Sequence, residues 1–201
     1  FSEFVNANPY YPVTNEDGTI LRDLDVYKRA NYADITATNP YYNAMLPSEN
    51  RSKILSVTNN TNLNWYIIDN LRWTASMSLN TTNTDNMNFT DPAHTKYASS
   101  DYTKQGEYSS SKSRSWRYTM NTGIAYALSL NDHNLTFNGR AEIRSTSSNT
   151  ESFVATGFPK GVGAIPSFAY SFKENSTPGY SESISRGVSF LGTFNYNYKY
   201  R

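Results

Sequence analysis

Apolar and polar residues alternate along five stretches of this chain of 201 residues. In the second stretch Leu71, Trp73 and Met77 share one side, whereas Arg72 and Thr74 lie on the other. Alternation with a period of two is typical of a β-strand whose two sides meet different surroundings. The sequence therefore predicts strands near residues 53–65, 71–80, 115–130, 135–145 and 186–201.

The links between these runs alternate between short and long. Residues 66–70 and 131–134 are short and contain Asp and Asn, which suit tight turns. Residues 80–114 and 146–184 lose the alternation and are predicted to be irregular loops. We expect residues 1–50 to be mostly extracellular loop as well. These runs are longer than the ~5–6 residues usual for strands of soluble domains. Long strands whose connections alternate between short turns and long loops are typical of outer-membrane β-barrels.

Charge within the runs falls almost entirely on the polar side. That side carries Arg72, Arg117, Arg140, Glu142 and Arg144, whereas the apolar side is charged only near its outer ends, at Lys53 and Arg186. An arginine or lysine facing lipid at mid-bilayer costs about 2–4 kcal/mol, while a wet lumen solvates it. We therefore expect a lipid-facing set that consists of Leu71, Trp73, Met77, Tyr126, Leu128, Phe137, Ile143, Phe190 and Phe194.

The composition mainly excludes other classes of partner, site and membrane segment. There are 18 Lys and Arg against 17 Asp and Glu, so the basic excess expected of a nucleic-acid partner is missing. The chain has no cysteine, which excludes disulfides and thiolate metal sites. No run approaches the ~18 apolar residues of a membrane helix, so membrane insertion would have to use strands. The aromatic content of 15% is high, whereas the mean hydropathy of -0.66 is that of a polar chain. The two values are compatible if aromatic and aliphatic residues alternate with Asn, Ser and Thr.

The predicted fold class is all-β, with antiparallel strands that form part of a large transmembrane β-barrel with long extracellular loops. The alternative is a soluble β-sandwich that binds glycans or acts as an adhesin, with the apolar side facing a protein core. A glycoside hydrolase is disfavoured because no paired carboxylates stand out at comparable strand positions. We expect no enzyme activity. Dependence on detergent would separate the first two possibilities.

Several motifs, in order along the chain, resemble the SusC/RagA-type TonB-dependent outer-membrane transporters. They are Asn8-Pro9-Tyr10-Tyr11, Asn39-Pro40-Tyr41-Tyr42-Asn43-Ala44, Asn50-Arg51-Ser52-Lys53, Trp65-Tyr66-Ile67-Ile68-Asp69-Asn70-Leu71, Ala155-Thr156-Gly157-Phe158-Pro159 and Phe194-Asn195-Tyr196-Asn197-Tyr198. Each motif alone is weak, whereas their order and spacing together are fairly specific. The resemblance implies a location in the bacterial cell outer membrane and nutrient uptake.

The resemblance also implies a barrel of about twenty-two strands with an N-terminal plug. Members import oligosaccharides or peptides with energy passed through TonB, and a surface lipoprotein of SusD type caps them as a lid. This sequence contains neither the plug nor the TonB box, so we expect residues 1–201 to be one barrel segment of a longer parent. TonB would then act through the missing N-terminal part, and outer-membrane lipid and lipopolysaccharide would surround the barrel.

Candidate chemical groups are sparse. His94 and His133 lack metal-ligand spacing, and we expect both to be solvated in a loop and a turn. Asp85, Asp91 and Asp101 share one predicted loop but lack the spacing of a calcium loop. We predict no catalytic, cofactor-binding or metal-binding residues, and the residues that bind substrate stay unknown.

Two further sequence features have a functional and a structural interpretation. Gly157, Gly161 and Gly163 with Lys160 lack the spacing of a phosphate-binding loop. The basic segment 112–117 could attract lipopolysaccharide or an acidic solute, although a polar loop end that leads into a strand is the preferred interpretation. Tyrosine-rich loop segments could stack on sugar rings or contact a lid protein.

Overall fold

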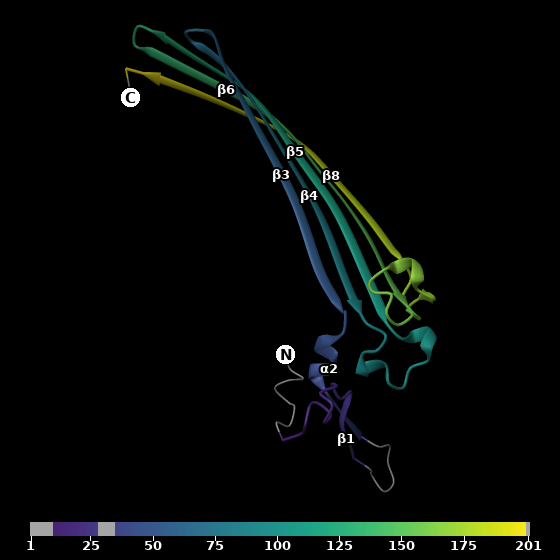
Figure 1. Ribbon diagram of the computed structural model, residues 1–201. Coiled ribbons are helices and arrows are strands. Elements are labelled where there is room, and N and C mark those ends of the chain that lie inside the picture. The colour runs from purple at the N-terminus through teal and green to yellow at the C-terminus, as the bar shows by residue number, and fades with distance from the viewer. Residues whose placement is uncertain (1–9, 28–34, 200–201) are drawn as a thin grey trace. The chain divides into compact units, whose positions relative to one another are not determined.

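The computed structural model describes residues 10–27 and 35–199 (Figure 1). The elements are β1 (Asp23–Tyr27), β2 (Ile35–Thr38), α2 (Pro40–Met45), β3 (Glu49–Ile68), β4 (Leu71–Thr90), η1 (Thr95–Tyr97), η2 (Tyr102–Lys104), β5 (Glu107–Leu130), β6 (His133–Thr156), η3 (Pro166–Phe168), β7 (Ser171–Phe172) and β8 (Gly179–Tyr198). The chain forms two compact units. Of the described residues, the loop unit comprises 10–27, 35–51, 86–110 and 152–178, and the sheet unit comprises 52–85, 111–151 and 179–199.

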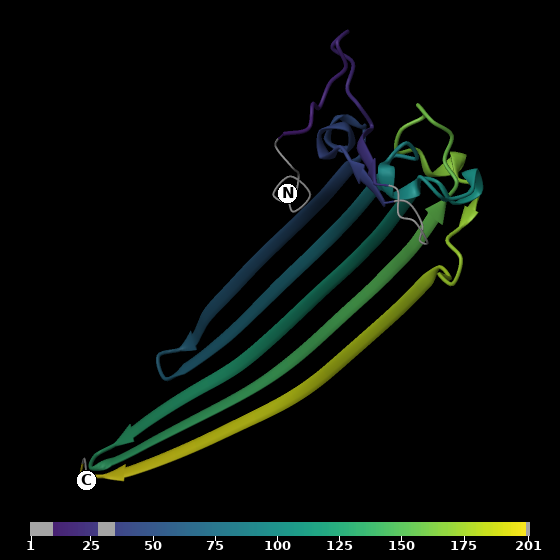
Figure 2. The same ribbon diagram turned by 90° about the horizontal axis from the view of Figure 1, so that it is seen from below.

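Five long strands make one sheet, in which each lies beside the long strand before it (Figures 1 and 2). The order is β3-β4-β5-β6, with both β8 and the short β7 paired to β6. Side-chain hydrogen bonds between β3 and β4 join Ser56 to Thr82, Thr58 to Asn80 and Asn60 to Ser78, so residue numbers rise along β3 as they fall along β4. This order of partners requires antiparallel strands. The predicted all-β, antiparallel fold class is confirmed.

The strands are longer than the sequence pattern predicts. β3, β4 and β8 have 20 residues each, and β5 and β6 have 24. Residues 80–114 and 146–184 are predicted from the sequence to be irregular loops. This expectation is wrong for residues 80–90, 107–114, 146–156 and 179–184, which belong to β4, β5, β6 and β8. Periodicity reveals a strand only where one side is apolar. Where Asn, Ser and Thr occupy both sides, the backbone ladder continues without that signal.

The two short connections are tighter than predicted. Only Asp69 and Asn70 separate β3 from β4, and only Asn131 and Asp132 separate β5 from β6. Asn131 has a φ of 49°, a left-handed conformation that Asn adopts more readily than most residues. His133 is consequently the first residue of β6 and does not belong to the turn.

The region expected to be mostly loop contains ordered elements. Thr14 forms an isolated bridge with Ile20 around a turn in which Gly18 has a φ of 82°. Strands β1 and β2 form an antiparallel pair, and helix α2 follows directly. Asn8 and Pro9 of the first Asn-Pro-Tyr-Tyr motif lie outside the described residues.

The second Asn-Pro-Tyr-Tyr motif starts helix α2. The side chain of Asn39 accepts a hydrogen bond from the Tyr41 amide, and Pro40 occupies the first turn, where its missing N–H costs nothing. Asn39 is fully buried and donates through Nδ2 to the carbonyl oxygens of Val13 (3.0 Å) and Leu21 (2.6 Å). This motif therefore joins the helix to the preceding turn.

A small apolar core holds the loop unit together. Met87, Phe89, Ala155 and Phe158 are buried against one another. The Phe89 and Phe158 rings meet edge to face with centroids 5.3 Å apart. These residues come from the ends of β4 and β6 and the loop after β6, so the core fixes where that loop begins.

Gly157 allows the chain to turn at this core. Its φ of 80° is left-handed, and a Cβ there would lie 2.5 Å from the Thr103 carbonyl oxygen and 2.6 Å from the Tyr170 Cβ. Any side chain would combine backbone strain with a collision. The Ala155-Thr156-Gly157-Phe158-Pro159 motif thus has a structural role in the loop unit.

Candidate functional site

The sheet unit has an apolar face without a covering layer among the described residues. Its exposed side chains include Leu63, Trp65, Met77, Met120, Ile124, Tyr126, Phe137, Ile143, Val188, Phe190, Phe194 and Tyr196. Phe190 is 81% exposed and Phe194 is 65% exposed. The buried hydrophobic residues that the structure describes, including Met87 and Phe158, all belong to the loop unit.

The expected lipid-facing set lies on this apolar face. Six of its nine residues are exposed, and Leu71, Trp73 and Leu128 are half-buried between neighbouring side chains. A soluble sandwich would require a second sheet against these residues, because exposed apolar patches of this kind are rare on monomeric soluble proteins. No second sheet lies against them in the part of the chain that the structure describes.

Trp73 shows how the apolar face accommodates polar atoms. Its Nε1–H donates to Thr122 Oγ1 at 2.8 Å, and its ring meets Trp65 edge to face at 6.3 Å. Beside it lies a shallow hollow of about 400 Å³, lined by Leu63, Trp73, Ala75, Met77, Met120, Thr122, Ala141 and Ile143. The satisfied indole N–H removes the main cost of placing Trp73 in an apolar medium.

Aromatic side chains gather beside the short turn at Asn131 and Asp132. His133 Nδ1 and the Tyr196 hydroxyl are 2.7 Å apart, and the His133 ring also lies 5.0 Å from that of Tyr198. His133 is exposed, as expected, and the register of β6 and β8 also brings its ring against those of Tyr196 and Tyr198. Amphipathic rings at the edge of an apolar band match the aromatic girdles of membrane barrels.

The opposite, polar face carries the predicted arginines. Arg140 Nη2 donates to Asn121 Oδ1 at 2.8 Å and lies 3.8 Å from Glu142. Arg117 Nε donates to Thr146 Oγ1 at 3.3 Å. The structure therefore brings the predicted charged residues to one face, as their alternation requires.

A second hollow lies on the polar face. It has a volume of about 380 Å³ and crosses β3 to β6, with a lining that includes Asn62, Asn64, Arg72, Thr74, Asn121, Asn138 and Arg140. Its polar side chains are guanidinium, amide and hydroxyl groups, and it contains no carboxylate. This chemistry suits hydrogen bonding to a solute from one side.

The other candidate groups are dispersed. Asp85 lies within β4, Asp91 accepts from the Ala93 amide at 2.7 Å, and Asp101 precedes η2, so the three do not share a loop. Among the described residues no group of three or more His, Cys, Asp and Glu could hold a metal. His94 Nδ1 accepts from the Lys96 amide at 3.1 Å and thereby caps η1.

The glycine-rich and basic segments also have structural explanations. Gly157, Gly161 and Gly163 all have positive φ, and the helix that follows them is the three-residue η3, too short for the helix of a phosphate-binding loop. The basic segment 112–117 lies inside β5, which corrects the interpretation as a loop end. Its charges are consequently divided between the two faces of a strand.

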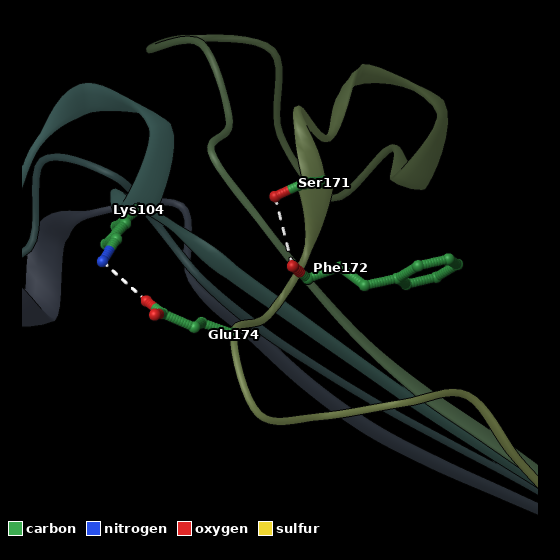
Figure 3. A network of polar contacts seen from close by, with 4 residues as sticks. All are labelled: Lys104, Ser171, Phe172 and Glu174. Carbon is green, nitrogen blue, oxygen red and sulfur yellow. Dashed lines mark hydrogen bonds and ion pairs between the residues drawn. The ribbon is translucent and has the colours of Figure 1, made fainter.

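Two ion pairs join the segment after β7 to the loop before β5 and to the first residue of β5. Lys104 Nζ lies 2.7 Å from Glu174 Oε2 (Figure 3), and Lys173 Nζ lies 2.7 Å from Glu107 Oε2. The hydrogen bond with Lys104 and then its charge lower the pKa of Glu174, and the same two causes raise the pKa of Lys104. Both side chains are solvent-exposed, so the pair contributes little stability.

We predict that acid loosens this contact. Because the pKa of Glu174 is lowered, its contribution is present above the unfolded value of ~4.3 and is lost as the pH falls through the folded pKa. The contribution of Lys104, whose pKa is raised, is present below ~10.4 and lost only at higher pH. Hydrogen exchange of residues 171–176 should accelerate between neutral and acid pH after correction for intrinsic rates. Lys104→Met should remove part of that acceleration, and an unchanged pH profile would contradict the prediction.

None of the described helices is long and apolar enough to cross a membrane.

Comparison with known proteins identifies the fold. No protein-family model and no curated protein sequence matches the chain. Among solved structures, the RagAB peptide transporter matches with a TM-score of 0.66 and 20% identity over 92% of this chain. The RagAB peptide importer matches in its open-open state (TM-score 0.64, 20% identity, 94% of this chain) and its closed-closed state (0.62, 19%, 94%).

These matches concern one part of a larger protein. The chain spans 20% of the length of each matched transporter chain. Identity near 20% supports a shared fold, and the similar structures named here are transporters rather than enzymes. The chain therefore has the fold of a segment of a RagAB-type transporter chain.

Proposed function

We propose that this chain is a wall segment of a transmembrane β-barrel in the bacterial outer membrane, whose parent imports peptides or oligosaccharides. The observation that carries the proposal is the pair of contrasting faces on one sheet of 20- to 24-residue strands. Phe137 and Phe190 on one face are exposed, with no covering layer in the described part of the chain, and the other face presents Arg72 and Arg140 around a polar hollow.

The apolar band has dimensions that suit a bilayer. A tilted strand crosses the hydrocarbon core with about 9–11 residues. The alternating apolar stretches 71–79 of β4 and 135–143 of β6 are close to this length. The remaining residues of these strands are rich in Asn, Ser and Thr, which favours a position outside the hydrocarbon.

The polar face and the matched proteins support the import part of the proposal. A barrel with this face inward has a wall that water and polar solutes can wet. The similar structures are a peptide transporter and a peptide importer, so a peptide is the first solute to test. An oligosaccharide stays an alternative, because amide and hydroxyl side chains bind either.

The partners of the parent form part of the same proposal. The motifs that resemble SusC/RagA-type transporters imply a surface lipoprotein of SusD type as a lid. They also imply TonB, which would act on a part of the parent outside these residues. Lipid and lipopolysaccharide would cover the apolar face.

Fractionation and uptake test the proposal together. The parent should be recovered with the outer membrane and should require detergent to dissolve. Deleting its gene should lower uptake of labelled peptides or of labelled oligosaccharides, and leave uptake of small sugars that enter by diffusion unchanged. Recovery of the parent as a water-soluble protein would instead favour the β-sandwich alternative.

A further inference from the structure

The two faces of the sheet unit differ in net charge. On its polar face the described residues include four arginines and a single carboxylate, Glu142. The positions in phase with the apolar face carry Lys53, Lys112, Arg114 and Arg186 against Asp85, Glu151 and Glu182. Charge is therefore nearly balanced on the apolar face and clearly positive on the polar face.

Most of the positive charge on the polar face lacks a carboxylate partner among the residues that the structure describes. Of the four arginines, Arg140 alone lies near a carboxylate of the described part of the chain, with its Nη2 3.8 Å from Glu142 Oε2. Among the described residues neither Arg72, Arg117 nor Arg144 forms an ion pair, and all three side chains are exposed. Unpaired guanidinium groups that share a wetted wall raise the local concentration of anions.

The backbone also makes room for this charge. Gly187 of β8 lies beside Arg144, and a Cβ at Gly187 would be 3.0 Å from Arg144 Nε. The side chain of Arg144 can therefore lie across the neighbouring strand. Arg72 and Arg140 reach the polar hollow, where Asn62, Asn64, Asn121 and Asn138 add amide donors.

We propose that this face is an anion-binding track and that the parent selects solutes bearing several carboxylates. A guanidinium group presents parallel N–H donors that match a carboxylate, and such charged hydrogen bonds are about twice as strong as neutral ones. Arg72 and Arg140 bind the carboxylates, and the amides of Asn121 and Asn138 bind the backbone or hydroxyl groups between them. The proposal rests on the proposed function, because it requires the polar face to line the solute path.

Two kinds of solute carry this chemistry, and the experiment separates them. The full-length parent in detergent is titrated at low salt with a glutamate decamer, a galacturonate oligomer, a lysine decamer and a neutral serine–glycine decamer. We expect at least one acidic probe to bind roughly tenfold tighter than the lysine decamer, since each guanidinium–carboxylate contact is a strong charged hydrogen bond. Preference for the glutamate decamer identifies acidic peptides, and preference for the galacturonate oligomer identifies acidic glycans.

Variants locate the effect on the polar face. R72Q/R140Q should abolish the preference for the acidic probe, and R72K/R140K should restore part of it by returning charge without the paired donors. K112Q/R114Q removes the same charge from the other set of positions and should leave the preference intact. Equal binding of acidic and basic probes, or equal effects of R72Q/R140Q and K112Q/R114Q, would overturn the proposal. Outer-membrane recovery of the parent is measured separately, so this inference can fail while the proposed function stands.

Discussion

Replacing Ala141 by arginine in the parent chain should reduce its amount in the outer membrane to a small fraction of the wild-type level. Ala141 lines the apolar hollow with Trp73 and Ile143, near the middle of the apolar stretch of β6. An arginine facing mid-bilayer costs about 2–4 kcal/mol, which is roughly a 30-fold or greater change in an equilibrium constant. The measurement is the quantity of parent in the outer-membrane fraction, by immunoblot.

Asn138 provides the matched control on the same strand. Its Nδ2 donates to Thr193 Oγ1 at 3.3 Å, and the residue lines the polar hollow. Asn138→Arg should leave the amount of parent nearly unchanged, because water can solvate the new charge. Equal outer-membrane levels of the two variants would mean that the faces do not meet lipid and water, and the barrel interpretation would then be wrong.

Phe89→Ala should destabilise the loop unit by about 3–5 kcal/mol, the usual cost of truncating a buried aromatic residue. Phe89 is 1% exposed and contacts the Phe158 ring edge to face. Its loss leaves a cavity at the point where the loop after β6 begins. Limited proteolysis within residues 157–178 should become much faster.

Phe168 is the control for this substitution, because it belongs to the same unit and is 49% exposed. Phe168→Ala should change the proteolysis rate little, since surface substitutions usually stay within about 0.5 kcal/mol. The sheet unit should keep its own exchange protection in both variants. Equal proteolysis of the Phe89 and Phe168 variants would show that the core does not hold this loop.

The sequence alone determined the fold class and the division into two faces. Alternation such as Leu71 next to Arg72, or Phe137 next to Asn138, assigns each residue to a side because side chains of a strand point alternately up and down. The sequence also predicts part of the candidate site. The four arginines of the polar face occupy positions of that face within their runs, so the alternation alone places them there. No long-range contact is needed for either conclusion.

Tertiary structure decided everything that depends on which strands are neighbours and where they end. Residues 80–86 continue β4 although the alternation is lost there, because cross-strand hydrogen bonds extend a strand whose two sides are both polar. The pairs His133 with Tyr196 and Arg144 with Gly187 depend on the register of β6 and β8. The polar hollow requires four strands side by side. Register couples residues far apart in sequence, so a local pattern cannot specify it.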